Sequence, residues 1–314
     1  MFFLVSALSG CASLVPQTMG LRDNWPQGVA DRADIRDVPF FSQEEFQCGP
    51  AALATTLVHA GTAVTADDLV PRVYLPAREG SLQVDMLAAP RRYGKVAYRL
   101  APRFDDLLRE VAAGNPVIVL QDNSVGAVSA WHYAVVVGFD YPAGELYLRS
   151  GVTERLAIPF TVFEYTWKKS NYWAMVTMPP NRLPVTATEA AYPSAIAAMA
   201  RVSEPADALL AYATFLVRWP GNEVASIALA NLHYARGALA EAESILRHAF
   251  VQHPDSVPVA NNLAHTLSEM GRNAEALELI SGIGSTPGPY EAAVRDTQSS
   301  IRQSLARESA DKRP

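Results

Sequence analysis

Of the two cysteines in this chain, Cys48 lies in the sequence context that most favours a reactive thiol. Residues 43–54 have the sequence Gln-Glu-Glu-Phe-Gln-Cys-Gly-Pro-Ala-Ala-Leu-Ala. Pro50 suits a first helical turn, and residues 51–59 form a good helical run. Because the first amides of a helix lack partners and carry partial positive charge, we expect Cys48 to ionise to a nucleophilic thiolate near neutral pH. The ordinary alternative is a small buried apolar side chain.

A thiolate nucleophile needs a group that takes up a proton and returns it, and histidine has a suitable pKa for both steps. The chain has six histidines. Four of them lie in a helical C-terminal region, and His59 falls on the helix that follows Cys48. His132 instead opens residues 131–140, Trp-His-Tyr-Ala-Val-Val-Val-Gly-Phe-Asp, which predict a buried strand with the imidazole at its mouth.

Three sequence blocks together carry a family resemblance. They are Val-Pro-Phe-Phe-Ser-Gln at residues 38–43, Cys-Gly-Pro-Ala-Ala-Leu at residues 48–53, and the block at residues 131–140. In this order and at this spacing they resemble the papain-like cysteine peptidases that are similar to the double-glycine leader peptidases of bacteriocin exporters. The resemblance covers roughly residues 36–180.

The resemblance implies a role for each residue of the site. Cys48 would attack the scissile carbonyl, His132 would act as general base and then as acid, and Gln43 would donate to the oxyanion. The chemistry agrees, because a side-chain amide and the backbone amide of Cys48 would together form the donor pair that a tetrahedral intermediate requires. Gln47 is the competing amide, but it is adjacent to Cys48 and would have to fold back.

The sequence departs from the family pattern at the residue that orients the imidazole, where the family has Asp or Asn on the returning strand. Along an extended strand Asp140 would lie roughly 25 Å from His132, too far to orient the ring. A hairpin turn at residues 141–144 instead brings residues 149–151 opposite His132, which makes Ser150 the best candidate. A hydroxyl stabilises an imidazolium less than a carboxylate does, so the level of activity stays open.

Asp122 is a second candidate for the orienting role. It follows the apolar strand expected at residues 116–120. The ordinary interpretation of such a residue is an exposed, solvated loop carboxylate, and we favour that interpretation.

The first eleven residues, 1–11, form a short apolar segment that ends in Leu-Ser-Gly-Cys. This ending resembles the lipobox of bacterial lipoproteins, which implies cleavage before Cys11 and lipidation of its thiol. The segment is shorter than the about 20 apolar residues that span a bilayer. No Lys or Arg precedes Arg22, although export signals normally begin with positive charge, and a frayed apolar terminus is the alternative. In bacterial lipoproteins, which this segment resembles, a residue other than Asp after the lipidated cysteine favours the outer membrane. Ala12 therefore predicts a location on the outer membrane, facing the periplasm.

The remaining segments predict two domains. Residues 12–35 have no clear period and predict a tether from the membrane. Residues 36–180 predict an α+β papain-like domain, a helix packed on an antiparallel sheet, which includes an amphipathic helix at residues 104–114. We expect a linker at residues 181–189 and an all-α tetratricopeptide-like domain of helical repeats at residues 190–308.

The repeats are indicated by small residues that recur at a fixed spacing. Three pairs are 34 positions apart: Gly237 and Gly271, Ala242 and Ala276, and Pro220 and Pro254. This period and the positions of Gly, Ala and Pro resemble tetratricopeptide repeats. In such repeats Gly occupies the turn, Ala lets the helices approach closely and Pro ends the second helix. Ala208 marks a weaker first copy. An ordinary helical bundle is the alternative.

Composition places limits on function. With 314 residues, 49% hydrophobic and 18% charged, the chain has an ordinary globular composition and room for two domains. The net charge of −6 argues against nucleic acid as a partner. No Cys-x-x-Cys or His-Glu-x-x-His spacing occurs, so we expect no metal and no cofactor.

The sequence therefore predicts a lipid-anchored cell-envelope cysteine peptidase. It would hydrolyse a peptide bond through a thioester on Cys48, while the helical repeats recruit a protein partner. Two alternatives stay open. One is a catalytically weak or inactive peptide-binding adaptor on the same fold, and the other is an amidase or acyltransferase that uses the same Cys-His pair.

Overall fold

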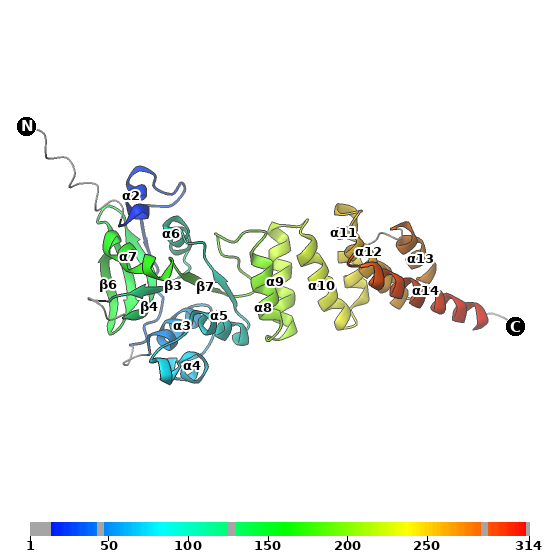
Figure 1. The fold of residues 1–314 in the computed structure, drawn as a ribbon, viewed down its shortest axis with the longest axis horizontal. Helices are drawn as coiled ribbons and strands as arrows, with labels where there is room; N and C mark the ends of the chain where they lie inside the picture. Colours follow the sequence, from blue (N-terminus) through cyan, green and yellow to red (C-terminus); the bar gives the residue numbers. More distant parts are fainter. Residues whose placement is uncertain (1–13, 43–46, 125–129, 284–287, 312–314) are drawn as a thin grey trace, which may run out of the picture. The chain divides into compact units, whose positions relative to one another are not determined.

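The computed structural model describes residues 14–42, 47–124, 130–283 and 288–311 (Figure 1). The chain divides into two compact units, Met1–Ser203 and Glu204–Pro314. Cys11 and Gln43, two residues with predicted roles, lie outside the described residues.

The first unit is built on an antiparallel sheet. Its main strands, in spatial order, are β2 (Val96–Arg99), β7 (Ala174–Met178), β3 (Val117–Asp122), β4 (Trp131–Asp140), β5 (Glu145–Ser150) and β6 (Thr153–Pro159). A further strand, β1 (Arg32–Asp34), pairs with the C-terminal end of β4, beyond the residues that pair with β3. The predicted turn at residues 141–144 joins β4 to β5, so the expected hairpin is present.

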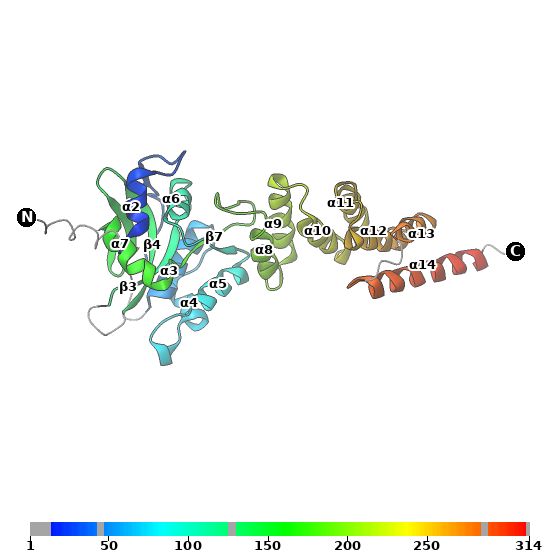
Figure 2. The same cartoon turned by 45° about the horizontal axis from the view of Figure 1, so that its top comes forward.

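Helices cover the sheet on both faces (Figures 1 and 2). On one face lie α3 (Cys48–His59), α4 (Ala66–Val73) and α5 (Gln83–Ala88), with the short 3₁₀ helices η1 (Pro76–Arg78) and η2 (Ala89–Tyr93). On the other face lie α2 (Pro16–Asp23), α6 (Phe104–Ala112) and α7 (Phe160–Trp167), which leads into η3 (Lys168–Ser170). This is the predicted α+β layout.

The central helix α3 is buried along most of its length. All residues from Gly49 to Leu57 are buried, so small side chains are needed where the helix meets its neighbours. At Gly49 an added Cβ would lie 2.2 Å from Ser81 Oγ, well inside van der Waals contact. Gly49 therefore permits a close approach that holds the first turn of α3 against the loop before α5.

The N-terminal segment differs from the tether predicted at residues 12–35. Within it, α2 packs on α7, and β1 joins the sheet. Glu164 on α7 is fully buried, and its carboxylate accepts hydrogen bonds from the backbone N–H groups of Gln17 at 2.9 Å and Thr18 at 2.6 Å. Two carboxylate bonds to a helix N-terminus explain why this segment folds without a sequence period, because the partner is far away in the chain.

The segment after β7 also belongs to the first unit. Thr186 donates from its backbone N–H and its hydroxyl to the buried carboxylate of Glu110, at 2.7 and 2.6 Å. The next helix, α8 (Tyr192–Ala200), packs on β2 and η2. The division after Ser203 therefore lies later than the start of the repeats predicted at residue 190.

The second unit is helical and follows the predicted period. Its helices are α9 (Pro205–Arg218), α10 (Glu223–Ala235), α11 (Leu239–Gln252), α12 (Val257–Glu269), α13 (Asn273–Gly282) and α14 (Glu291–Asp311). Ala208, Ala242 and Ala276 are all fully buried. Gly237 and Gly271 both have a φ of 75°, the left-handed conformation that glycine tolerates in a tight turn.

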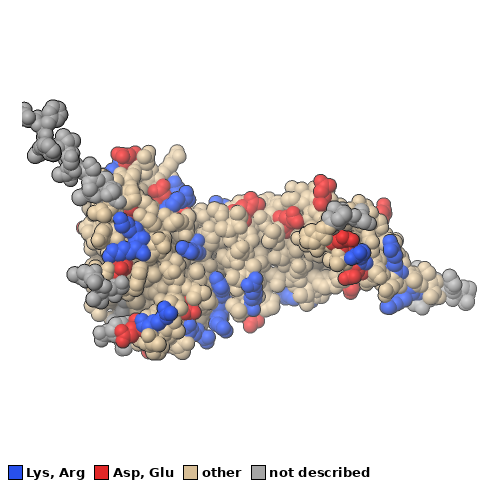
Figure 3. Space-filling model, in the orientation of Figure 1, with Lys and Arg blue, Asp and Glu red and all other residues tan. Residues whose placement is uncertain are grey.

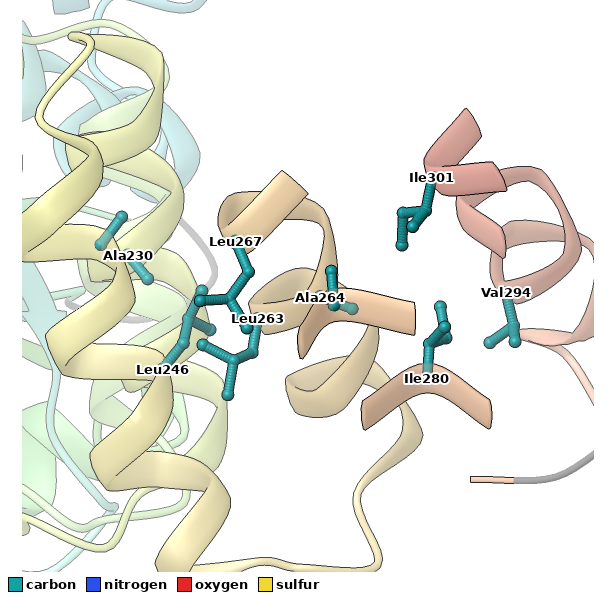
Figure 4. Packing of buried hydrophobic residues seen from close by; sticks show 10 residues of the cluster. Ala230, Leu246, Leu263, Ala264, Leu267, Ile280, Val294 and Ile301 are labelled. Carbon is teal, nitrogen blue, oxygen red and sulfur yellow. The ribbon is translucent and has the colours of Figure 1, made fainter. Parts of the chain in front are cut away.

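The core of this unit connects successive helix pairs (Figure 4). Leu246 of α11 and Leu263 of α12 belong to the same buried cluster as Ile280 of α13 and Ile301 of α14. Each helix thus buries its apolar side against the next pair, as stacked repeats do. In the described part of the chain, no helix is both long enough and apolar enough to cross a bilayer.

Candidate active site

Cys48 lies at the first residue of α3, as predicted, and is a free thiol. Three backbone N–H groups act on its sulfur: those of Tyr133, Gly49 and Cys48 itself. Two of these belong to the first turn of α3, whose amides have no partners within the helix. The third comes from β4, so the helix start and the strand start meet at the sulfur.

The pKa of the Cys48 thiol differs in direction from the sequence-based expectation. Burial raises this pKa above the ordinary value, and it outweighs the three N–H groups, which lower it. The helix N-terminus alone therefore does not produce a thiolate, because loss of hydration penalises the charged sulfur more than the amides favour it. The thiol needs a base to become a nucleophile.

His132 lies at the start of β4 and is paired with Ser150, the residue that the predicted hairpin brings back toward it. His132 Nε2 and Ser150 Oγ lie 2.9 Å apart. A register shift in the β4–β5 pairing places Arg149 opposite Val135, so Ser150 reaches His132 as a diagonal neighbour on the same face of the sheet. Burial lowers the pKa of His132, which keeps the ring neutral and able to accept a proton.

The sulfur of Cys48 and the backbone of His132 lie at the same end of β4, while the residues of β4 that line the cleft around Cys48 are the two neighbours of His132, Trp131 and Tyr133. Tyr133, whose N–H acts on the sulfur, directly follows His132, so less than one residue of backbone separates that N–H from the base of the His132 side chain. Among the hydrogen bonds of the described residues, none joins the sulfur to the ring. In enzymes without substrate such contacts are often long and shorten in the complex.

Cys48 opens into a cleft of about 610 Å³ within the first unit. Trp131 lines it and is half exposed, which provides an apolar surface at the start of β4. Tyr133 lines it as well, and its hydroxyl donates to the carbonyl of Ser81 at 3.2 Å. The loop that ends at Ser81 thereby forms one wall, and Lys169 and Asn171 from the end of η3 form another.

The two other acidic candidates near β4 have different roles. Asp122 is the last residue of β3 and is buried, not an exposed loop carboxylate as we favoured from the sequence. Burial would raise its pKa, but N–H groups of Ala130 and Ser124 donate to its carboxylate and hold the pKa below the ordinary value. Asp140 lies at the opposite end of β4 from His132 and forms an ion pair with Arg32 at 2.9 Å.

Sequence reasoning missed the contribution of the loop before α5. Ser81 lines the cleft with Cys48, and its Oγ is buried without a hydrogen-bond partner among the described residues. The preceding residues Glu79 and Gly80 indicate a turn, since Glu79 has a φ of 48°. Such a turn could be predicted, but its docking against Gly49 depends on long-range packing. No group of three or more His, Cys, Asp or Glu residues that could hold a metal occurs among the described residues.

An α+β domain with a cysteine at a helix start and a histidine at a strand start is the arrangement of a papain-like cysteine peptidase. Comparison with known families agrees: residues 35–175, just under half of the chain, match the Peptidase_C39 like family, and residues 259–280 match the tetratricopeptide repeat. The N-terminal unit thus has the C39-like fold, and the C-terminal unit contains tetratricopeptide-type repeats. The predicted fold class is confirmed.

Two solved structures are similar to the first unit. A C39-like peptidase from Bacillus anthracis is 18% identical with a TM-score of 0.40, and the alignment covers 47% of this chain and 97% of that one. A double glycine motif protease from an AMS/PCAT transporter, in complex with the leader peptide, is 21% identical with a TM-score of 0.35 and coverages of 46% and 96%. At these scores neither likeness carries a further argument. No curated protein matches the chain.

Proposed function

We propose that this protein is a cysteine peptidase. The sulfur of Cys48 attacks the scissile carbonyl carbon, while His132 takes the thiol proton and passes it to the leaving amine. Water then releases the acyl group from the thioester, and the thiol regains its proton. The observation that carries the proposal is the 2.9 Å pairing of His132 with Ser150, at the strand end whose next N–H acts on the sulfur.

The His132–Ser150 pairing also determines which ring nitrogen is the base. In the tautomer with its proton on Nε2, the ring donates to Ser150 Oγ and the lone pair of Nδ1 is free to accept the thiol proton. Ser150 would then fix the tautomer and the orientation of the ring, the role that a carboxylate or an amide has in other triads. Gln43 remains the proposed oxyanion donor, together with the backbone N–H of Cys48.

A peptide-binding adaptor is the second candidate, and a specific observation favours it. Burial raises the pKa of Cys48 and lowers that of His132, so the thiol and the imidazole are both neutral at rest. A hydroxyl is the only orienting group that contacts the ring among the described residues. Both facts would reduce nucleophilicity, so the same cleft could bind a peptide without cleaving it.

Peptide-library cleavage and iodoacetamide labelling separate the two candidates. We expect wild type to cleave, Cys48→Ser to be inactive, and His132→Ala to lose about 100-fold or more in rate. His59→Ala is the matched control, because His59 lies on α3 and bonds to the carbonyl of Gly114 at 3.1 Å, away from the sulfur. Absence of cleavage, with labelling of Cys48 unaffected by His132→Ala, would favour the adaptor. Acyl transfer to an added amine in place of water would identify an amidase or acyltransferase.

We also propose an anchor and a partner for the chain. Cleavage before Cys11 and lipidation of its thiol would place the protein on the outer membrane facing the periplasm, and the repeats of the second unit would recruit a protein. Buried small residues at the period of 34 and the repeat match at residues 259–280 support the second point. Intact mass and membrane fractionation of wild type against Cys11→Ser test the anchor.

A further inference from the structure

The beginning of the described chain is fixed at α7 and η3. Lys168 donates from Nζ to the carbonyl of Leu14 at 2.6 Å, and Glu164 of α7 holds the N-terminus of α2. Cys11 precedes Leu14 by three residues, so their Cα atoms are at most about 11 Å apart along the chain. A lipid on Cys11 would therefore hold this side of the first unit against the bilayer surface, with no long tether between them.

The surface at this point has the composition of a membrane interface. Leu14, Val162 and Tyr165 are 46%, 49% and 45% exposed. The Nζ atoms of Lys169 and Lys168 lie 5.1 and 5.9 Å from the centre of the Tyr165 ring. Tyrosine with adjacent lysines is typical of the headgroup level, where the ring is amphipathic and lysine amines reach phosphates. We name these five residues the α7 face.

The charge of the α7 face suits an anionic surface. Glu164 is the one acid in α7, and it is fully buried. Lys168 makes one hydrogen bond within the unit, so two of its three N–H donors are left for phosphate. Lys169 makes two hydrogen bonds and lies 4.0 Å from the Asp122 carboxylate, so its ammonium contributes less than that of Lys168. Figure 3 shows Lys and Arg side chains gathered over the region in which Figure 1 draws α7.

We propose that the α7 face lies on the membrane and binds anionic phospholipid headgroups. This inference rests on the proposed lipid anchor and goes beyond it, because it assigns one orientation to the peptidase unit. Lys169 also lines the cleft that contains Cys48. The cleft then opens next to the bilayer surface, which favours peptide segments that lie close to the membrane as substrates.

Site-directed fluorescence tests the orientation on the full chain. An environment-sensitive thiol fluorophore is attached to Val162→Cys, in a Cys48→Ser background, and the lipidated protein is reconstituted in vesicles of phosphatidylethanolamine with phosphatidylglycerol. The control is Val84→Cys on α5, which carries the same side chain at 64% exposure on the opposite face of the sheet (Figure 1). We expect a blue shift and quenching by brominated lipid at position 162 and neither at position 84.

The lysines give a second, quantitative readout. In unlipidated Cys11→Ser protein, Lys168→Gln and Lys169→Gln should each weaken binding to vesicles with phosphatidylglycerol by about fivefold, with little effect on vesicles of phosphatidylethanolamine alone. Lys95→Gln, on the loop before β2, is the control and should not change binding.

The outcomes separate the anchor from the face. If the protein is lipidated but the fluorophore at position 162 is as exposed to water as the one at position 84, the proposed membrane contact of the α7 face is wrong and the proposed anchor is supported. Protein without lipid on Cys11 that still binds vesicles through position 162 would support the face and overturn the anchor. Protein that has no lipid and does not bind vesicles would overturn both. None of these outcomes bears on whether the protein cleaves peptides in solution, so the peptidase proposal is tested independently.

Discussion

Replacing Ser150 by a stronger hydrogen-bond acceptor tests the proposed mechanism most directly. Ser150 Oγ lies 2.9 Å from His132 Nε2, so Ser150→Asp would put a carboxylate within ion-pair distance of the ring. A neighbouring negative charge favours the imidazolium and raises the pKa of His132 by about one to three units. Proton transfer from the thiol of Cys48 to the ring then becomes easier.

The size of the effect follows from the two pKa values. With ordinary values of 9.0 for the thiol and 6.5 for the imidazole, about one pair in 300 is a thiolate with an imidazolium, before the attraction between the two charges is counted. Burial moves both pKa values in the direction that makes this ion pair rarer. Each unit gained by His132 raises the ion-pair population about tenfold relative to the neutral pair, so Ser150→Asp should speed alkylation of Cys48 at neutral pH by up to about tenfold per unit.

The rate of iodoacetamide alkylation, followed by mass spectrometry of the Cys48 peptide across pH, measures this effect. In wild type burial lowers the pKa of His132, so the ring becomes protonated, and can no longer accept the thiol proton, only when the pH falls below that lowered pKa. Ser150→Asp should move this acid limb to higher pH. Ser150→Ala removes one neutral hydrogen bond, worth about 1 kcal/mol, and should lower the rate of peptide cleavage about fivefold.

Thr153→Ala is the matched control for these variants. Thr153 pairs with Ser150 across β5 and β6, is exposed, and also carries a hydroxyl. Its removal should leave the alkylation rate and the acid limb unchanged. If Ser150→Asp and Ser150→Ala both behave like Thr153→Ala in a folded protein, Ser150 does not orient His132 and the triad assignment is wrong.

Two further predictions concern packing. Gly49→Ala places a Cβ 2.2 Å from Ser81 Oγ and should lower the free energy of unfolding of the first unit by about 1–3 kcal/mol, measured by urea denaturation. Gly20→Ala is the control and should not destabilise the unit, because no atom lies within 4 Å of the added Cβ. Ala242→Leu adds volume at a fully buried repeat position and should reduce the stability of the second unit by a similar amount, seen as a lower melting temperature of the helical circular dichroism signal. Ala240→Leu, on the exposed side of the same helix, is the control and should change the melting temperature little. Equal effects of either substitution and its control would contradict the packing described.

The features that sequence predicted correctly depend on local geometry. The rise per residue of a strand and a four-residue turn suffice to predict that the chain returns to His132 near Ser150. The register shift in the hairpin displaces Ser150 along β5 by too little to break its contact with His132. Similarly, a turn followed by Pro50 suffices to start α3 at Cys48. The period of 34 in the second unit is also a local signal, because each repeat contacts its neighbours.

The features that sequence did not predict depend on contacts between distant residues. The helix α2 is held by Glu164, 147 positions after Gln17, and nothing in its own short sequence specifies that partner. The direction of the Cys48 pKa is a second example, since helix position favours a thiolate but desolvation is set by every element packed around the sulfur. Local helix propensity and the spacing of residues in the sequence do not show which distant segments will bury a given side chain.

The extra strand β1 has a consequence for how the first unit can be isolated. The family match begins at residue 35, after both α2 and β1. A fragment cut at that point would expose the edge of β4 that pairs with Ala33 and would leave the Glu164 carboxylate inside the protein without its two amide donors. The unit that folds on its own is therefore larger than the region that sequence similarity defines, and a fragment made for assay should begin upstream of Pro16.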